Sequence, residues 1–565
     1  MVKPMKIALV NPACLDPRIS DKDAGIVPIG LFYIGAVLEH NGFSTEIVNL
    51  AQKGTDPLQA FRDFAARVMP DIIGFSVTNP NRWNAIECAI AAQQLPCDPV
   101  IVFGGPAATF MAQYFLTLCP AIDYIVTGEG EITFLELVKA VSQGRKQDIK
   151  NIKGLVFRQD KNNITETGRR RPADSLDSFA HPSDYFVYNH LAMSRGCPGK
   201  CTFCGSPEFW KDSRVRSHSP SWFADEIQAL ARKGVSHFYI SDDTFTMDRQ
   251  KTMQLCRLII EKKLRITWNA ISRVDCIDED ILFHMRRAGC IQLSFGVESG
   301  SEKIRKTLGK PVDQETIISA FRLTASYGIL PRAYFIYGSP GETSETIQNS
   351  VELLKKIKPL AAIFYMLVIF PGTFLYRKAL KQGLVSPEIW NDKIEDIPWF
   401  ELDENLDFPM VKSFGDQLRT AFYSSVDEFA HSLTPVDINE LYPFHADFLS
   451  RLAMTFSHGE YAKDSRIKNQ DITAEHLYHK ALSFWPDSRA FLGLAMLAQK
   501  KRQFDKAGQI LEKGLKEHPS DRDLNICTGI NFMNQGRFRA ALDIFEPFRQ
   551  FPETARYINI CRQRI

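Results

Sequence analysis

Three closely spaced cysteines are the residues of this chain best suited to chemistry. Cys197, Cys201 and Cys204 lie in the run Ser-Arg-Gly-Cys-Pro-Gly-Lys-Cys-Thr-Phe-Cys-Gly, just after the apolar stretch that begins at Leu191. Thiolates are the usual protein ligands of iron–sulfur clusters. Three of them on one short loop can hold three irons of a cubane cluster and leave the fourth iron open to a small molecule. We therefore predict an open-iron 4Fe-4S cluster at this loop.

Two simpler metal sites fit this loop less well. A structural zinc site usually has four ligands in two separated pairs, and no second pair or histidine partner stands at a suitable spacing downstream. An electron-transfer cluster of the ferredoxin kind needs a fourth cysteine. The next cysteine, Cys256, lies in a segment with a helical pattern far along the chain. The spacing therefore favours a cluster with one open iron.

The cysteine motif resembles that of the radical S-adenosylmethionine (SAM) superfamily, which has this spacing and an aromatic residue, here Phe203, before the last cysteine. The resemblance implies that the amino and carboxylate groups of SAM bind the free iron. It also implies that one electron from the reduced cluster splits the sulfonium and yields a 5′-deoxyadenosyl radical. Cys197, Cys201 and Cys204 would then be both the metal ligands and the catalytic residues.

Residues 190–385 alternate short apolar runs with amphipathic segments. This alternation predicts parallel strands joined by helices, and six strands predict a partial (β/α)6 barrel of the TIM type. The expected strands are 190–194, 237–241, 266–272, 291–296, 332–337 and 361–370. Functional side chains of such barrels lie at the carboxyl ends of the strands. Polar or glycine-rich residues follow these strands, so we expect them to line one rim.

Bound SAM needs several kinds of partner at that rim. Its ammonium group needs oxygen acceptors, its carboxylate needs a cation, and its ribose hydroxyls suit an acidic side chain. Family members bind the ammonium group at the end of the second strand, although their usual Gly-Gly-Glu is absent here. Glu298 is the candidate for the ribose, the alternative being a carboxylate that faces a helix N-terminus; Arg273 or Arg332 is the candidate for the carboxylate. The full predicted set is Phe203, Ser241, Asp242, Asp243, Arg273, Glu298, Ser299, Arg332, Gly338 and Ser339.

Residues 1–150 carry a second pattern of short apolar strands and intervening helices. The pattern predicts an open, doubly wound, Rossmann-like sheet that binds a ligand across the carboxyl ends of its strands. The expected strands are 6–10, 44–48, 72–77, 100–103 and 123–126. No Gly-x-Gly-x-x-Gly fingerprint follows the first strand, which argues against a nicotinamide cofactor.

The runs that begin at Pro28, Asp71, Phe103 and Tyr124 resemble the cobalamin-binding domain that precedes the cluster domain in one radical SAM class. The resemblance implies a set of small and permissive residues in contact with cobalamin. These are Asn11, Pro12, Gly30, Ser76, Val77, Thr78, Gly104, Gly105, Pro106, Gly128, Glu129 and Gly130. The domain's only histidine, His40, lacks the Asp-x-His-x-x-Gly context of a cobalt ligand, so cobalt is expected without a protein histidine. In the alternative reading, the domain binds no corrinoid and serves only as a lid.

Three further segments complete the expected organisation. Residues 151–189 are predicted to be a linker, and the aromatic-rich residues 386–465 a helical cap over the open side of the barrel or a second linker. In residues 466–565, similar residue types recur with a period of roughly 34 residues, the length of a tetratricopeptide repeat. So short an array either offers a concave surface to a protein partner or only packs against the enzyme, and the sequence leaves both open.

Size and charge limit the remaining function classes. The 565 residues allow several domains, each with its own core. A formal charge of +2 without a long basic block argues against a nucleic-acid partner. Neither a secretory signal nor a run of apolar residues long enough to span a membrane is evident. We therefore expect a cytoplasmic protein without a transmembrane segment, whose twelve cysteines stay reduced.

The leading functional hypothesis is a cobalamin-dependent radical SAM C-methyltransferase. The resemblance implies that the radical takes a hydrogen atom from an unactivated carbon of a small-molecule, lipid or peptide substrate, that methylcobalamin delivers the methyl group, and that a second SAM remethylates the cobalt. No side-chain base makes such a carbon nucleophilic at neutral pH. The alternatives are a radical SAM enzyme for cyclisation, carbon–carbon coupling or rearrangement, and a non-catalytic assembly protein with a structural cluster. An external reductant of the flavodoxin or ferredoxin type is implied, while the sequence does not identify the substrate.

Overall fold

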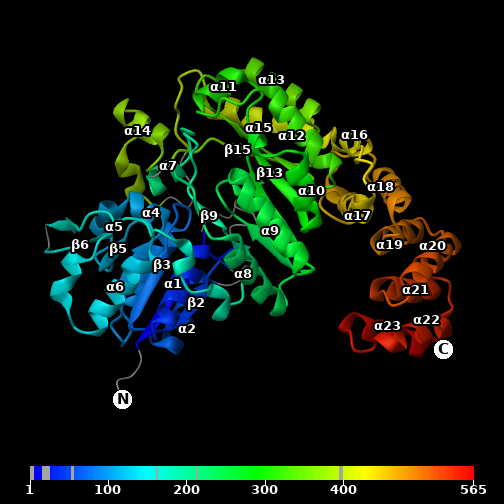
Figure 1. Ribbon diagram of the computed structural model, residues 1–565, viewed down its shortest axis with the longest axis horizontal. Coiled ribbons are helices and arrows are strands. Elements are labelled where there is room, and N and C mark those ends of the chain that lie inside the picture. The colour runs from blue at the N-terminus through cyan, green and yellow to red at the C-terminus, as the bar shows by residue number, and fades with distance from the viewer. Residues whose placement is uncertain (1–4, 15–25, 52–55, 161–162, 212–213, 394–398) are drawn as a thin grey trace.

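The computed structural model describes residues 5–14, 26–51, 56–160, 163–211, 214–393 and 399–565. Along the chain it forms an N-terminal α/β domain, a second α/β domain with a parallel sheet, and a run of helices (Figure 1). In Figure 1 the first domain is blue to cyan, the second is mostly green, and the last helices form an orange and red arc. The predicted mixed α/β fold with a helical C-terminal region is therefore confirmed.

The N-terminal sheet has the strand order β2-β1-β3-β4-β5-β6-β7, and its first five strands are parallel. Its strands are β1 (Lys6–Asn11), β2 (Ser44–Asn49), β3 (Ile72–Ser76), β4 (Val100–Gly104), β5 (Tyr124–Val126), β6 (Leu155–Arg158) and β7 (Ile164–Glu166). Its helices are α1 (Ile29–His40), α2 (Pro57–Val68), α3 (Arg82–Ala92), α4 (Pro106–Phe110), α5 (Ala112–Leu118) and α6 (Glu131–Ser142). The order of the first five strands is that of a doubly wound sheet, whose ligands bind at the carboxyl ends of the strands.

The segment expected to be a linker contains two of these strands. β6 pairs antiparallel with β5, and β7 pairs antiparallel with β6. The first sheet therefore extends beyond residue 150, and only the residues after β7 connect the two domains.

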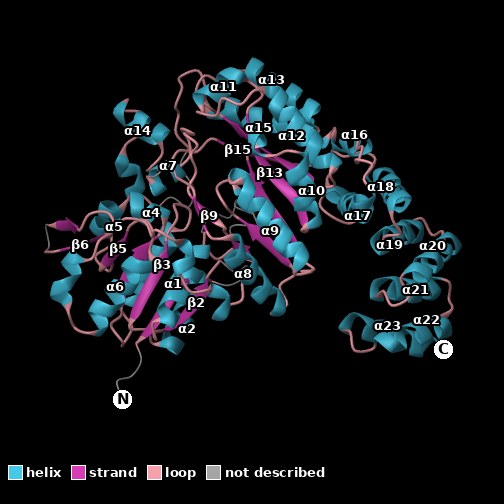
Figure 2. Cartoon of the chain, in the orientation of Figure 1, coloured by secondary structure: helices cyan, strands magenta, loops and turns pink. Residues whose placement is uncertain are grey.

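The second sheet consists of six parallel strands in the order β15-β14-β13-β12-β11-β8. Its strands are β8 (His190–Leu191), β11 (His237–Ile240), β12 (Thr267–Ser272), β13 (Cys290–Glu298), β14 (Leu330–Tyr337) and β15 (Ala361–Met366). Its helices are α7 (Ser206–Trp210), α8 (Pro220–Arg232), α9 (Arg249–Glu261), α10 (Glu279–Arg287), α11 (Glu302–Thr307), α12 (Gln314–Ser326), α13 (Ser344–Ile357) and α14 (Phe374–Lys381). This is the partial barrel predicted from the sequence, drawn with magenta strands in Figure 2.

Local side-chain caps fix where several barrel helices begin. Asp248, Asp278 and Asp313 each accept a backbone N–H bond in the first turn of α9, α10 and α12. Such caps pair amide groups that a helix start otherwise leaves open. They therefore set the point at which each loop of the rim ends.

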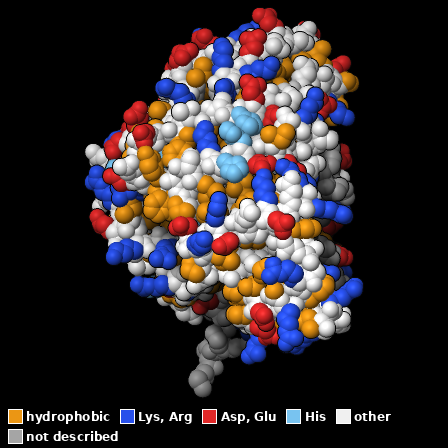
Figure 3. Space-filling model, turned by 90° about the vertical axis from the view of Figure 1, so that its right-hand side faces the viewer, with side chains coloured by type: hydrophobic (Ala, Val, Ile, Leu, Met, Phe, Trp, Pro, Cys, Tyr) orange, Lys and Arg blue, Asp and Glu red, His pale blue; other side chains and the backbone are white. Residues whose placement is uncertain are grey.

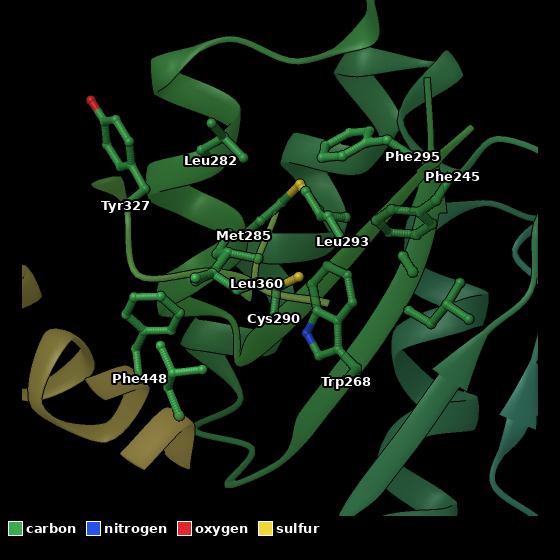
Figure 4. Packing of buried hydrophobic residues seen from close by; sticks show 14 of the residues in the cluster. Phe245, Trp268, Leu282, Met285, Cys290, Leu293, Phe295, Tyr327, Leu360 and Phe448 are labelled. Carbon is green, nitrogen blue, oxygen red and sulfur yellow. The ribbon is translucent and has the colours of Figure 1, made fainter. Parts of the chain in front are cut away.

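The core of the barrel domain lies between the sheet and its outer helices. Figure 4 shows Trp268 of β12 beside Met285 and Leu293, and the Trp268 ring centroid lies 5.2 Å from that of Phe245. Trp268 and Phe295 are fully buried. Because successive strand residues point to opposite faces, the neighbours of these residues face the inside of the barrel.

The two α/β domains share buried apolar packing. Tyr33 and Val37 of α1 belong to the same buried cluster as Trp222 of α8. Ile336 of β14 and Ile369 belong to the cluster of the first sheet. The carboxyl ends of the two sheets are thus held close together.

The segment 386–465, expected to be a helical cap or a second linker, contains three α-helices within its described residues. Its helices are α15 (Phe408–Tyr423), α16 (Val426–His431) and α17 (Tyr442–Ser457). Val411 and Phe414 of α15 are buried with Tyr337 of β14 and Ile347 of α13, so α15 covers the outer face of the sheet. The amphipathic pattern of α15 suits the position of a barrel helix after β15.

The C-terminal helices pack mainly with their neighbours along the chain. They are α18 (Gln470–Phe484), α19 (Ser488–Lys500), α20 (Phe504–Glu517), α21 (Arg522–Asn534), α22 (Phe538–Phe545) and α23 (Pro552–Arg564). The pair α19–α20 and the pair α21–α22 begin at the spacing of the sequence repeat. Their assignment to the tetratricopeptide family stays a prediction.

Helix hydropathy and surface charge bear on whether the chain could contact a membrane or nucleic acid. Within the described parts of the chain, no helix is long and apolar enough to cross a membrane. On the face shown in Figure 3, basic and acidic side chains are intermixed, with hydrophobic side chains between them.

Candidate active site

The three cysteines lie on the loop after β9 (Ser194–Arg195), close to the carboxyl end of β8. β9 pairs antiparallel with β10 (Arg216–Ser217), which holds both ends of this loop. The loop starts at Gly196 with φ +101°, where a Cβ would stand 2.6 Å from the carbonyl oxygen of Arg214. Only glycine fits this position.

The donor set of the loop fits an iron–sulfur cluster. The N–H groups of Gly199 and Ser206 lie 3.4 Å from the Sγ atoms of Cys197 and Cys204, respectively, and hydrogen bonds to sulfur tune such clusters. Burial raises the pKa of Cys201 to about 11, so iron must displace the thiol proton on binding. In the described residues, no three His, Cys, Asp or Glu side chains converge on a single metal ion; thiolates on a cubane bind separate irons.

A turn between α11 and α12 supports the cysteine loop. Thr202 N–H donates to the carbonyl oxygen of Leu308 at 2.9 Å, and Thr202 Oγ1 donates to that of Thr307 at 3.2 Å. Gly309 has φ +71°, and a Cβ there would stand 2.5 Å from the carbonyl oxygen of Lys200. Phe203, the aromatic residue of the motif, packs against the apolar cluster of the first domain. The loop therefore touches both domains.

The predicted residues at the end of β11 have different roles. Asp242 is buried, and its carboxylate accepts backbone N–H bonds from Met193 at 2.9 Å and Ser194 at 2.7 Å. It fastens β11 to β9 and does not face the rim. Asp243 accepts bonds from Ser206 Oγ at 2.8 Å and Trp210 Nε1 at 2.9 Å, and thereby holds α7. Asp243 and Ser241 both line the large cavity described below.

Of the two predicted cations, only Arg273 lies at the rim. Its Nη1 lies 3.9 Å from the Cβ position of Gly199 in the cysteine loop, and it binds Asp275 through Nε at 2.9 Å and Nη2 at 2.7 Å. Arg332 lies near the start of β14, paired with Ala361, and its charge acts on Tyr461 of the C-terminal region. About 17 Å of strand separate it from the rim. Arg332 is therefore misplaced as a candidate for the SAM carboxylate.

Glu298 lies at the end of β13 inside the barrel and carries an ion pair that the sequence did not predict. Its Oε1 accepts a hydrogen bond from Lys310 Nζ at 2.8 Å, and both side chains are largely buried. Glu298 has φ +64°, a conformation that side chains other than glycine rarely adopt and that often marks functional sites. The next residue, Ser299, is fully buried and contacts Ser350, so its side chain serves the packing.

The loop 338–342 at the end of β14 closes around a carboxylate. Glu342 Oε2 accepts bonds from the N–H groups of Gly338 at 2.5 Å and Ser339 at 3.1 Å. Burial raises the pKa of Glu342 to about 7. Ser339 Oγ and Glu342 Oε1 are buried without a hydrogen-bond partner in the described structure. Gly341 N–H donates to Asp403 at 2.7 Å, which links this loop to the segment before α15.

A cavity of about 310 Å³, which opens to solvent, lies between the carboxyl ends of the two sheets. The first domain contributes eight of the residues predicted to contact cobalamin: Gly30, Ser76, Gly104, Gly105, Pro106, Gly128, Glu129 and Gly130. A Cβ at Gly30 or Gly128 would meet no other atom within 4 Å. These glycines therefore keep open a space that side chains would fill, which fits a large flat ligand such as cobalamin.

The other four residues predicted to contact cobalamin do not line this cavity. Asn11 and Val77 are buried, with Asn11 Nδ2 bound to Asn49 and Val77 N–H bound to Gly104. Pro12 and Thr78 are both bound to Asn81. Their hydrogen bonds join the ends of β1 and β3 to neighbouring segments of the first domain.

Four charged side chains join the two domains at the wall of the cavity. Arg195 of β9 binds Glu131 at 2.7 Å and Glu129 at 3.5 Å, and Arg216 of β10 also binds Glu129. The guanidinium of Arg195 lies 5.0 Å from the ring centre of Tyr33. The sequence marked Glu129 only as a cobalamin contact, and nothing in the local pattern indicated its basic partners.

No histidine is among the described residues that line this cavity. His40 is the last residue of α1, whose residues as far as Ile34 line the cavity, so about 9 Å of helix separate it from the ligand space. From the second domain, His218 bonds Tyr33 Oη at 2.9 Å and Asp177 at 3.0 Å. Burial lowers the pKa of His218 to about 4. Cobalt ligation without a protein histidine remains the expectation for this site.

Comparisons with known proteins match the two domains in the same order. A model of the B12 binding domain matches residues 24–138, and a model of the radical SAM superfamily matches residues 191–354. The chain is 30% identical to an uncharacterized methyltransferase of Pyrococcus horikoshii over 69% of this chain and 86% of that protein. It is 29% identical to an anaerobic magnesium-protoporphyrin IX monomethyl ester cyclase of Rubrivivax gelatinosus over 62% of this chain and 66% of that protein.

A solved structure supports the same arrangement of domains. The radical SAM methyltransferase TsrM of Kitasatospora setae, with cobalamin and a 4Fe-4S cluster bound, superposes with a TM-score of 0.62. The match covers 85% of this chain and all of that chain at 18% identity. At this identity the likeness shows a shared fold.

Proposed function

The chain belongs to the radical SAM superfamily, in the group whose cluster domain follows a B12-binding domain, and from this premise we propose that it is a C-methyltransferase. Its cofactors are a 4Fe-4S cluster, SAM and cobalamin. We propose further that the acceptor is an unactivated carbon of a small molecule, a lipid or a peptide. The methyltransferase names of two similar proteins support transfer of a methyl group over other radical chemistry.

One observation carries the proposal: a single cavity is bounded by both domains. Gly104 and Gly128 line it from the B12-binding domain, and Ser241 and Asp243 line it from the barrel rim. When bound, the cluster with SAM supplies a carbon-centred radical and the corrinoid supplies a methyl group. Both reagents must reach the same substrate carbon, which requires one shared chamber between their sites.

The side chains of this chamber suit a radical reaction. Apart from a few charged groups, its lining consists of apolar and small residues, among them Phe103, Phe134 and Phe209. Such a lining excludes water and offers few weak hydrogen donors near the reacting carbon. The ion pairs of Arg195 hold its two walls together.

The experiment uses the full chain, purified and reconstituted without oxygen and supplied with reductant and methyl-labelled SAM. We expect co-purifying or added cobalamin to bind, SAM to be cleaved to 5′-deoxyadenosine, and label to enter the product. Cys201→Ala should abolish cleavage. Cys276→Ala is the matched control, because Cys276 is a partly buried cysteine at the rim outside the loop, and it should cleave SAM normally.

Three other outcomes would contradict the proposal in distinguishable ways. Deoxyadenosine without label in the product would favour cyclisation, coupling or rearrangement, the chemistry class in which the cyclase relative falls. SAM cleavage without any corrinoid binding would make the first domain a lid. Retained cleavage in Cys201→Ala would remove the cluster assignment.

Two partners belong to the same proposal. The cluster requires an external one-electron donor, for which a flavodoxin or ferredoxin is the expected kind. No disulfide joins any of the twelve cysteines, all of which lie in the described residues, and we propose that the protein acts in the reducing cytoplasm. The paired helices α19–α22 would then serve either a protein partner or the packing of the chain itself.

A further inference from the structure

We propose that α14 and the neighbouring part of the cysteine loop form the docking face for a small, acidic one-electron carrier protein. The inference rests on the proposed radical SAM function, because a cluster that must be reduced from outside needs such a partner. It adds to that function the surface at which the electron enters.

The first argument is that α14 begins at the cysteine loop. In its first turn, Leu375 N–H donates to the carbonyl oxygen of Thr202 at 3.0 Å. One turn further, Arg377 binds Glu208 of α7 at 2.9 Å. The helix therefore contacts both the loop of the three cysteines and the helix that follows this loop. Lys200, which lies between two of the cysteines, is exposed, so a carrier bound here would stand next to the cluster.

The second argument is the composition of the exposed side of α14. Its exposed residues are spaced i, i+3, i+4 and i+7, so they lie on one side of the helix. They are Phe374, Arg377, Lys378 and Lys381. The Phe374 side chain is 53% exposed, and α14 has no acidic residue. An exposed aromatic ring among basic side chains suits an interface with an apolar centre and a charged rim.

The third argument is the local excess of positive charge. The whole chain carries a formal charge of only +2. Lys200, Lys378 and Lys381 nevertheless form no ion pair within the described parts of the chain. Glu208, the acidic side chain that touches α14, is paired with Arg377. The face is therefore positively charged, which attracts an acidic protein from a distance and orients it on arrival.

The C-terminal helices are the other candidate for a docking surface, and they lie far from the cysteine loop. In Figure 1, α14 and α7 lie on the left of the molecule, whereas α19 to α23 form the arc on the right. The barrel helices α10 and α12 lie between them in this view. Because an electron passes between proteins only over a short distance, a carrier bound to the arc would not reach the cluster. The helix α14 is the better placed surface.

The test compares sources of electrons for the reconstituted full chain and measures the 5′-deoxyadenosine formed from SAM. An acidic flavodoxin and an acidic ferredoxin, each kept reduced by its reductase, serve as carriers, and dithionite serves as a reductant that needs no docking face. The double variant Lys378→Glu with Lys381→Glu should raise the carrier concentration for half-maximal rate by about tenfold at low salt. Its rate with dithionite should stay within about twofold of normal. The matched control is Lys513→Glu with Lys516→Glu, because these lysines have the same spacing and are exposed on α20; it should respond to carriers normally.

Salt and conservative variants separate attraction by charge from other effects. Added salt should weaken the carrier-driven rate of the unmodified protein more than that of the charge-reversed variant, and Lys378→Arg with Lys381→Arg should keep the normal carrier dependence. Phe374→Ala should raise the half-maximal carrier concentration by about fivefold.

Four results would overturn the proposal. They are an unchanged carrier dependence in the charge-reversed variant, an equal loss with dithionite, a loss in the control on α20, and activity of the unmodified protein with dithionite but with neither carrier. Failure of the unmodified protein to cleave SAM even with dithionite would instead refute the proposed function itself.

Discussion

Replacement of Arg195 by glutamine should loosen the contact between the two α/β domains. The guanidinium binds Glu131 at 2.7 Å and Glu129 at 3.5 Å, and the ring centres of Tyr33 and Phe179 lie 5.0 and 5.6 Å away. Both carboxylates follow β5 of the first domain, whereas Arg195 directly precedes the cysteine loop. The substitution therefore acts where the cofactor cavity meets the cluster.

The expected loss of stability follows from the burial of these side chains. The side chains of Arg195, Glu129 and Glu131 are 13%, 13% and 5% exposed, and removal of one partner from a buried ion pair costs about 3–5 kcal/mol. Arg216 still neutralises Glu129, so the orphaned charge is mainly that of Glu131, and we expect a loss of about 3 kcal/mol. The double variant with Glu131→Gln removes both charges and should recover about 1–2 kcal/mol of that loss.

Native-state hydrogen exchange measures this loss at the contact itself, because a chain with several domains does not unfold in one step. Amides of α1 and α8 should exchange about 100-fold faster in Arg195→Gln, the factor that corresponds to about 3 kcal/mol. The control is Arg67→Gln, which breaks an exposed pair with Glu46 and should cost less than about 1 kcal/mol. Equal exchange rates in the two variants would refute the idea that Arg195 holds the domains together.

Four further predictions follow from single side chains. Burial raises the pKa of Glu342 from 4.5 to about 7, so the folded protein favours the protonated carboxyl group. The free energy of unfolding should therefore fall by about 3 kcal/mol as the pH rises from 4.5 to 7. Melting curves of Glu342→Gln should lack this pH dependence, and an unchanged dependence would contradict the prediction. Burial lowers the pKa of His218 from 6.5 to about 4, so the folded protein favours the neutral imidazole. The stability that this gives the folded protein is fully present above pH 6.5 and is lost as the pH falls toward 4. The melting temperature of His218→Gln should depend less on pH in this range, and equal melting curves would argue against a buried neutral imidazole. A Cβ on Gly296 would stand 2.2 Å from Glu298 Oε1 and 2.4 Å from Lys310 Nζ, so Gly296→Ala should displace this ion pair and weaken SAM binding at normal iron content. Unchanged SAM binding in a titration would count against that crowding. Asp242→Asn should lower thermal stability by about 1–3 kcal/mol and leave SAM affinity unchanged, whereas a selective loss of SAM binding would return Asp242 to the ligand site.

The sequence predicted the fold well because its signals are local. Each of the six barrel strands was found from an apolar run, and the first five strands of the N-terminal sheet were found in the same way. The missed strands β6 and β7 carry only a weak pattern and form an antiparallel hairpin at the sheet edge. The predicted last strand, 361–370, ends earlier, at Met366, because apolar residues continue into the loop where they pack against the first domain.

The candidate site was predicted less completely, because side-chain direction at a strand end depends on a single residue of register. Asp242 and Asp243 are adjacent and chemically alike, yet one fastens β9 from within and the other lies at the cavity. Arg332 was assigned to the correct strand but lies at its opposite end. A motif gives the order of residues along the chain, and it does not give the face or end on which each of them lies.

A glycine in a ligand site acts through its own backbone, whereas a charged residue acts through a partner elsewhere in the chain. This difference explains which residues of the cofactor sites could be predicted from the sequence. All five glycines that the sequence assigned to cobalamin line the cavity, since a glycine acts through its own backbone and its missing side chain. Lys310 and Arg195 act through carboxylates that are distant or in another domain, so their roles appear only when strands are paired and domains are docked. The same reasoning indicates where substitutions should separate binding from folding. Gly30 can be replaced with loss of ligand space alone, because a Cβ there would meet no other atom within 4 Å. A change at Arg195 must alter the docking of the domains before it alters the ligand.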